Sequence, residues 1–388
     1  MMNPGTPETL GVHNRTVILD FVRKHGPVSR AELSRKLDIS FPSVSSNVKK
    51  LLESNYLKIA GSGDNKVGRK ATLLEFNATW GYIIGSDIGR SQIRVMLSDL
   101  EGKELIYLKH DYNALDGENI VEERLLELAL TAVKEAGVKP EQIKYFSLGM
   151  PGIMDPNTGK LILVPFMSSI DIDGIVKCIK SIFDAPVVVE NSVNLGAIGE
   201  KWKGVAKGHR DILYLSYGVG IGSALILSGE LYRGVNNAAG EVGYMVPGKS
   251  NLRSEFDEQG VLEMLVSGST IQKDMTKIGI GQDFRSLIDG NRNKMPAVQE
   301  IIERIASHIG IMLVNAVSVI NVELIVIGGR LGDLIGPYLA PYWKNLLSNH
   351  VPFPPNILIS SLQEKASVLG GFAIGMRHVS DSLVAQIA

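Results

Sequence analysis

Hydrophobic positions recur with two different periods along this chain of 388 residues. Near the N-terminus they follow helical spacing, which predicts three short helices. The second helix is expected to begin with Ser29 as its N-cap, and the third with Ser40. Two apolar runs, at 57–60 and 72–76, then predict a β-hairpin.

After residue 77 strand patterns dominate, and the chain becomes apolar and rich in glycine. Stretches 82–99 and 212–227 each predict a strand, a glycine turn and a second strand. The β-branched residues at 187–189 predict a buried strand whose carboxyl end carries polar side chains, which is where ligands bind in open α/β sheets. The longest apolar run, 309–329, is interrupted by polar residues, and we interpret it as a buried helix and strand rather than a membrane span.

Charge is distributed unevenly along the chain. The net charge is −1, but residues 1–77 hold twelve Lys and Arg against seven Asp and Glu, which gives about +5 there and about −6 in the remainder. This asymmetry suggests one module that binds a polyanion. Cys178 is the only cysteine, which excludes an intramolecular disulfide and favours a reducing cytoplasm. Residues 1–11 have no apolar segment typical of a signal peptide.

The second and third helices, joined by a tight turn, are typical of a helix-turn-helix, and the hairpin is typical of its wing. The residues expected to contact DNA are Ser43, Ser45, Ser46, Asn47, Lys49 and Lys50 on the outer face of the third helix, and Arg69 and Lys70 near the wing tip. Small polar side chains allow close approach to base edges, and lysines reach phosphates. The alternative is a plain three-helix bundle with a solvated polar face.

The segment Glu190-Asn191-Ser192, at the end of the strand at 187–189, resembles the sugar site of the ROK family (repressors, open reading frames and sugar kinases). The first domain resembles the winged helix of ROK repressors. The resemblance implies a two-lobed α/β domain with the actin-like ATPase fold of ROK sugar kinases, preceded by a winged helix-turn-helix domain. It implies a DNA-binding domain at 1–77, a small lobe at 78–193 and 372–388, and a large lobe at 194–371.

The resemblance also implies a set of sugar-binding residues: Gly152, Asn191, Ser192, Glu241, Tyr244 and Glu263. Carboxylates accept hydrogen bonds from sugar hydroxyls, and an amide both donates and accepts. In the kinases of the family, the position of Ser192 holds an Asp that takes the proton from the attacking hydroxyl. A serine with no nearby base cannot do so, and we expect no catalytic residue. Locally, Asn191 and Ser192 are equally consistent with a helix cap, and the two glutamates with solvated surface acids.

Two glycine turns and a later glycine pair resemble the nucleotide-binding segments of the family's kinases. The positions concerned are Asp87, Gly89, Gly218, Gly220, Gly222, Gly328 and Gly329. Arg90 and Val219 depart from the kinase pattern, because they replace a glycine and a threonine that would bond phosphate. These departures weigh against Mg-ATP as a cofactor. Ordinary β-hairpins are the alternative for both turns.

The zinc signature of the family is changed as well. By resemblance, its histidine position holds Tyr244, and its three cysteine positions hold Ser254, Phe256 and Val261. None of these is a usual zinc ligand. We therefore expect the structural zinc to be lost and no metal or other cofactor to be required.

Together these features predict a cytoplasmic, sugar-responsive transcriptional regulator, in most proteins of this type a repressor. Its expected partners are double-stranded operator DNA, a monosaccharide effector and a second copy of the chain in a homodimer or higher homo-oligomer. The main alternative is an ATP-dependent kinase of the glucose or N-acetylglucosamine type with a DNA-binding appendage. A binding protein that has lost both activities is a third possibility.

Overall fold

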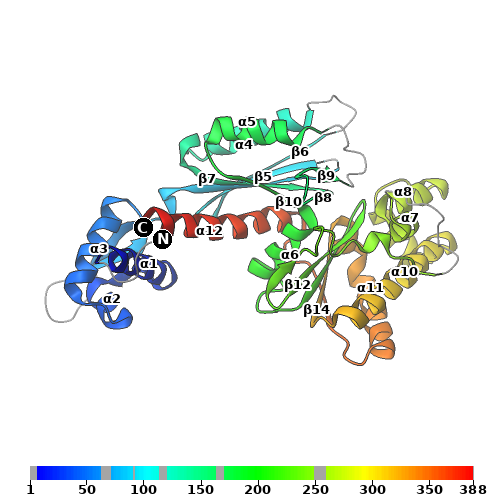
Figure 1. Ribbon diagram of the computed structural model, residues 1–388. Coiled ribbons are helices and arrows are strands. Elements are labelled where there is room, and N and C mark those ends of the chain that lie inside the picture. Colours follow the sequence, from blue (N-terminus) through cyan, green and yellow to red (C-terminus); the bar gives the residue numbers. More distant parts are fainter. Residues whose placement is uncertain are drawn as a thin grey trace.

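The computed structural model describes residues 7–62, 71–90, 92–112, 120–162, 170–248 and 259–387. Within these ranges, a three-stranded sheet belongs to the N-terminal domain, and two five-stranded sheets form the centres of two lobes. Figure 1 shows the N-terminal domain beside the first lobe and far from the second.

The N-terminal domain is a winged helix, as the hydrophobic pattern predicts. Its elements are α1 (Pro7–His25), β1 (Val28–Ser29), α2 (Arg30–Leu37), α3 (Phe41–Glu53), β2 (Leu57–Ser62) and β3 (Thr72–Phe76). The side chain of Ser29 accepts a hydrogen bond from the N–H of Glu32 and caps α2. Ser40 is the N-cap of α3, although its side chain makes no capping hydrogen bond. Apolar residues of all three helices, including Ile18 and Leu33, form the buried core.

The small lobe is a sheet covered by helices on both faces. Its elements are η1 (Ala78–Trp80), β4 (Tyr82–Ile88), β5 (Gln92–Asp99), β6 (Glu104–Asp111), α4 (Ile120–Glu135), η3 (Pro140–Gln142), β7 (Ile143–Met150), β8 (Ile153–Met154), β9 (Leu161–Ile162), α5 (Ile172–Phe183) and β10 (Val187–Asn191). The strand order is β10-β7-β4-β5-β6, parallel from β10 to β4 and antiparallel from β4 to β6. Helices α4 and α5 pack on one face, and the C-terminal helix α12 (Ala366–Ile387) packs on the other.

The large lobe repeats this arrangement. Its elements are α6 (Ser192–Lys203), β11 (Ile212–Tyr217), β12 (Ile221–Leu227), β13 (Glu230–Tyr232), η4 (Val242–Tyr244), α7 (Val261–Val266), α8 (Gly268–Lys277), α9 (Arg285–Arg292), α10 (Pro296–Ile320), β14 (Leu324–Gly328), α11 (Arg330–His350), β15 (Asn356–Ile359) and η6 (Gln363–Lys365). The order β13-β12-β11-β14-β15 has the same parallel and antiparallel halves as the first sheet. This duplicated sheet is the actin-like architecture expected from the sequence.

Helix α10 and strand β14 occupy the long apolar run, as predicted. By length and composition alone, α10 could cross a membrane. Its residues Ile305, Ile309 and Leu313 are instead fully buried in the core of the large lobe, against α11 and the second sheet. Packing inside the protein therefore accounts for the hydropathy of this helix.

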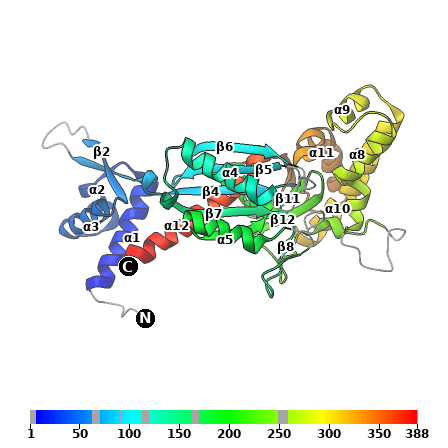
Figure 2. The same ribbon diagram turned by 90° about the horizontal axis from the view of Figure 1, so that it is seen from above.

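Helices α6 and α12 lie between the two sheets and pack along each other (Figures 1 and 2). Helix α6 packs on the second sheet through Val193 and Ala197, whereas α12 packs on the first through Phe372. Glycines allow the helix backbones to meet. A Cβ atom on Gly370 would overlap the carbonyl oxygen of Leu195, and one on Gly199 would overlap that of Ala366.

Substitution Gly370→Ala tests this backbone contact. In an ordinary helix interior the change stabilises by about 0.5–1 kcal/mol. Here we expect the free energy of unfolding to fall by about 2 kcal/mol or more, because the added methyl group meets the backbone of α6. Chemical denaturation measures the change. Arg377→Ala, on the exposed side of the same helix, is the control and should shift stability by less than about 0.5 kcal/mol. If Gly370→Ala stabilised the protein, the close contact between the backbones of α6 and α12 would be contradicted.

Candidate functional site

The outer face of α3 carries most of the residues predicted to contact DNA. Ser46, Lys49 and Lys50 are exposed, and Ser43 and Ser45 are half-buried. The expectation for Asn47 is wrong. Asn47 is 6% exposed, and its amide donates to the carbonyl oxygen of Ser43 at 2.8 Å, so it faces the core and not the solvent. Arg69 and Lys70 lie outside the described residues.

The polar cluster that follows β10 forms the start of α6. Asn191 caps this helix, because its Oδ1 accepts hydrogen bonds from the backbone N–H groups of Val193 and Asn194 at 2.7 and 3.2 Å. The same side chain donates through Nδ2 to the carbonyl oxygen of Gly152 at 2.7 Å. The helix-cap interpretation of Asn191 is therefore correct, and the same residue also joins two segments predicted to bind sugar.

Ser192 is the first residue of α6. Its hydroxyl oxygen is buried and has no hydrogen-bond partner among the described residues. A buried polar atom without a partner is unfavourable by about 1–3 kcal/mol, and a ligand hydroxyl would relieve that cost. Because the oxygen is closed off from solvent, a ligand would reach it only after the segments around it separate, and the geometry supplies no base.

Glu190 links the two lobes, which sequence reasoning missed. Its Oε2 accepts hydrogen bonds from Nε and NH2 of Arg233 at 3.0 and 2.5 Å, and Arg233 directly follows β13 of the large lobe. Its Oε1 accepts from the N–H of Asn191 and from the amide of Asn194, both at 2.9 Å. In addition, Asn237 of the large lobe donates to the carbonyl oxygen of Met154 at 2.8 Å. These contacts join the two lobes beside the end of β10.

The two glutamates predicted to bind sugar lie close together in the large lobe. Burial and the neighbouring Glu263 carboxylate raise the pKa of Glu241 to about 7. Burial also raises the pKa of Glu263, although a hydrogen bond from the N–H of Ile221 and the charge of Arg90 oppose the shift. Neither carboxylate is fully solvated. The alternative that Glu241 and Glu263 are ordinary surface acids is therefore excluded.

Strand β12 connects these glutamates to the start of α6. A Cβ atom on Gly222 would lie 3.3 Å from the side chain of Val193. At the next position, the N–H and the hydroxyl of Ser223 donate to the carbonyl oxygen of Gly240, at 3.0 and 2.8 Å. Gly222 thus packs against the residue that follows Ser192, and Ser223 holds the residue that precedes Glu241. Adjacent positions of one strand therefore contact both segments. Tyr244 follows within η4 and is half-buried.

At the first glycine turn, the residue expected to hold magnesium is already paired within the protein. Asp87 and Arg94 face each other across β4 and β5, and NH1 of Arg94 donates to Oδ2 of Asp87 at 3.0 Å. The carboxylate is 5% exposed, and its Oδ1 has no partner among the described residues. Gly89 lies in the turn itself, where its N–H donates to the carbonyl oxygen of Gln92. The guanidinium of Arg94 thus already neutralises the charge of the Asp87 carboxylate.

Three of the other glycines of the expected nucleotide site have structural explanations. A Cβ atom on Gly220 would lie 2.7 Å from Oε1 of Glu263, and one on Gly328 would lie 2.6 Å from the hydroxyl of Tyr214. Gly329 caps α11 with φ of 84°, a conformation that favours glycine. At Gly218, by contrast, a Cβ atom would meet only the backbone nitrogen of Arg330, at 4.0 Å, so close packing does not require glycine there.

The positions of the family's zinc ligands do not fit a zinc ion. Tyr244 and Val261 are described and offer no suitable donor, and Ser254 and Phe256 lie outside the described residues. In the described part of the chain, no group of three or more His, Cys, Asp or Glu could hold a metal ion.

The fold is that of a winged helix joined to a two-lobed actin-like α/β domain. A model of the ROK family matches residues 83–377, and a model of winged helix-turn-helix DNA-binding domains matches residues 14–58. The chain belongs to the ROK family, as the sequence motifs indicated.

Relatives of this chain include both regulators and a kinase. A xylose repressor of Bacillus spizizenii is 29% identical over 371 residues, which cover 95% of this chain and 96% of the repressor. A solved ROK family transcriptional regulator, a homologue of the E. coli MLC protein, has a TM-score of 0.75 at 19% identity and covers 97% of this chain and 98% of its own. A ROK hexokinase from Thermus thermophilus, with a TM-score of 0.63 at 25% identity, covers 77% of this chain and 99% of its own.

The raised pKa of Glu241 predicts a pH dependence of stability. Between about pH 4.5 and about pH 7 the folded chain keeps the Glu241 proton that the unfolded chain loses, so the free energy of unfolding falls as pH rises through this window. Glu241→Gln removes this contribution. We expect the variant to gain on the order of 1–3 kcal/mol relative to the parent protein between pH 5 and pH 8. Denaturation at both pH values measures the gain.

Glu303→Gln, an exposed change on α10, is the control for charge removal. Its free energy of unfolding should change between the two pH values as much as that of the parent protein does. Equal pH slopes for Glu241→Gln and the parent protein would show that Glu241 titrates normally.

Proposed function

We propose that this protein is a sugar-responsive transcriptional repressor that binds operator DNA through its winged helix and a monosaccharide between its two lobes. The observation that carries the proposal is the combination of exposed lysines on the outer face of α3 with a polar cluster at the junction of the lobes that has Ser192 in place of a base. Similarity over nearly the whole length of a xylose repressor supports this function.

The proposed sugar site is formed by Asn191, Ser192, Glu241 and Glu263, with Gly152 and Tyr244 beside them. Carboxylates accept from sugar hydroxyls, and the unpartnered hydroxyl of Ser192 can both donate and accept. A ring of hydroxyls matches such a mixed set better than an apolar ligand would. Xylose is the first sugar to test, because the regulator relative carries that name.

We propose further that the protein does not transfer phosphate. Two features support this: the Asp87 carboxylate is paired with Arg94, and the position of the proton acceptor holds Ser192. Residues at the expected nucleotide site thus do not fit a magnesium nucleotide. The rival function, an ATP-dependent hexose or N-acetylhexosamine kinase, lacks both the free carboxylate and the base. The cytoplasm is the proposed location, and a homodimer would present two recognition helices to two half-sites.

Fluorescence anisotropy on DNA from the protein's own upstream region tests the function. We expect one of xylose, glucose or N-acetylglucosamine to change the Kd for DNA by about tenfold or more, which is about 1.4 kcal/mol of coupling. The change should be the same with and without Mg-ATP. No specific DNA binding, or a response that requires ATP turnover, would favour the kinase.

Substitution of the exposed lysines tests the DNA-binding face. Lys49→Ala and Lys50→Ala each remove a cation from the outer face of α3. Each should weaken binding for all DNA sequences and reduce the slope of log K against log salt by about 1. Lys177→Ala, an exposed change on α5, should leave both quantities unchanged. If the parent protein and all three variants had equal salt slopes, the DNA would bind at a surface other than the outer face of α3.

A further inference from the structure

The winged helix is not attached by a free linker. Its core and the inner face of the small-lobe sheet belong to one continuous apolar cluster, which includes Leu74 of the wing and Phe372 of α12. The connecting segment is bonded at both ends: Asn77 donates from its N–H to Tyr56, and Ala78 accepts from the N–H of Leu100. The orientation of the DNA-binding domain is therefore set by its contacts with the rest of the chain.

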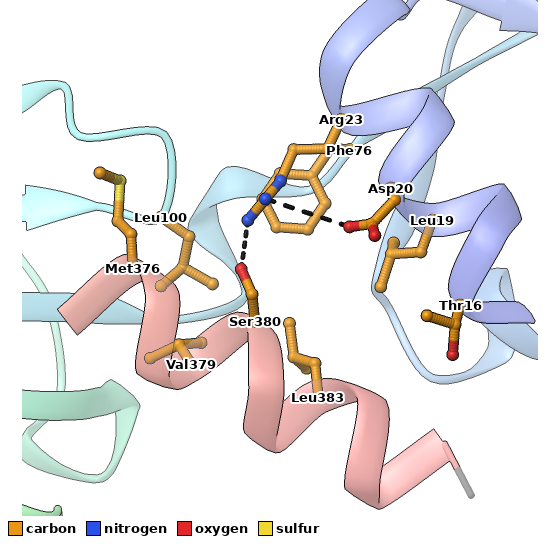
Figure 3. A pocket seen from close by; sticks show the side chains of 10 residues that line it. All are labelled: Thr16, Leu19, Asp20, Arg23, Phe76, Leu100, Met376, Val379, Ser380 and Leu383. Carbon is orange, nitrogen blue, oxygen red and sulfur yellow. Dashed lines mark hydrogen bonds and ion pairs between the residues drawn. The ribbon is translucent and has the colours of Figure 1, made fainter. Parts of the chain in front are cut away.

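The contact surface lies between α1 and the last turns of α12 (Figure 3). Leu19 on α1 and Val379 and Leu383 on α12 supply its apolar part. The polar part is a chain of three side chains. Arg23 donates through NH1 to the hydroxyl of Ser380, and its NH2 lies 4.0 Å from Oδ1 of Asp20.

The opposite end of α12 is interlocked with the helix that begins at the sugar site. Gly370 meets the backbone of α6 at Leu195, only one turn after Ser192. Because this contact joins two backbones, neither helix can slide past the other without separating. A change at the start of α6 is therefore passed to α12.

A sugar between the lobes would produce such a change. Helix α6 rests on the second sheet and α12 on the first, so any rotation of one lobe against the other acts on the α6–α12 contact. Figure 1 shows α12 running beneath the first sheet from α6 to α1, and Figure 2 shows the end of α12 that lies beside α1. A single helix of 22 residues thus connects the α6 contact to the DNA-binding domain.

Space beside the end of α12 allows it to move. A hollow of about 250 Å³ borders Val379 and Leu383, between Trp80, Lys144 and Asp184. A tightly packed helix end could not tilt without a large loss of contacts, whereas this one has room on one flank.

We propose, on the basis of the proposed function, that α12 transmits sugar binding to the winged helix and that Arg23 and Ser380 are the positioning residues at its far end. Neither residue belongs to the sugar site or to the DNA-binding face. Their hydrogen bond fixes the orientation of α1 on α12, so that movement of α12 reorients α3 relative to a half-site. Without it, the winged helix keeps its apolar contacts, but movement of α12 no longer reorients α1, and DNA binds in the same way whether or not sugar is bound.

Arg23→Gln and Ser380→Ala test the proposal in the full-length protein. Anisotropy with operator DNA and calorimetry with the effective sugar give both affinities and their coupling. For both variants we expect each separate Kd to stay within about threefold of the parent value, while the sugar-dependent change in DNA affinity falls from about tenfold to less than about twofold. Lys24→Gln, an equal change of charge at an exposed neighbour on α1, should keep the full response. Arg23→Lys keeps a charged donor on a side chain of similar length and should respond more strongly than Arg23→Gln.

A distance measurement reports the same linkage without DNA. In a Cys178→Ser background, spin labels at Lys36→Cys on α2 and Lys134→Cys on α4 follow the winged helix against the small lobe. Sugar should shift the distance distribution in the parent background and leave it unchanged in Arg23→Gln. If Arg23→Gln and Ser380→Ala respond to sugar like the parent protein, the role of α12 is refuted while the repressor function stands. If no sugar changes DNA affinity in the parent protein, both proposals are refuted.

Discussion

The backbone contact between α6 and α12 is the constraint on which the rest of this structure depends. Each helix covers a different sheet, and glycines at Gly199 and Gly370 let the two covering helices share one thin layer between the lobes. A side chain at either position would push the sheets apart. The same contact places the start of α6, with its polar cluster, at the junction of the two lobes, and directs the far end of α12 to the DNA-binding domain.

Two carboxylates near the junction of the lobes are already paired with arginines of the protein. Arg94 pairs with Asp87, and Arg233 pairs with Glu190. In a kinase, metal ions would supply such positive charges and phosphates would require them. Here arginine side chains supply the positive charges. What the protein leaves unmatched is suited to a neutral polyol: a buried serine hydroxyl, and a glutamate whose pKa of about 7 reflects its burial next to a second acid.

Several of these features could be predicted because their signals are local. Helix caps, glycine turns and strand periods each depend on a few neighbouring residues, and the structure has the two duplicated hairpins and the Ser29 cap where the sequence indicated them. The pairing of Asp87 with Arg94 was also predictable but was missed: once the hairpin turn is assigned, these opposite charges fall directly across from each other. Asn47 was misplaced because polarity was weighed above position. It shares the helical face of Val44, Val48 and Leu51, which is buried.

By itself, then, the sequence determined the elements, the order of the domains and the chemical groups available for a sugar and for DNA, because each of these depends on short-range pattern or on a motif. Only the tertiary structure decided which groups meet. The Glu190 to Arg233 contact joins positions 43 apart, and the Arg23 to Ser380 contact joins positions 357 apart. No periodicity relates such pairs. They meet because two sheets and the helices between them pack in one arrangement, and burial and close packing, rather than local propensity, select that arrangement.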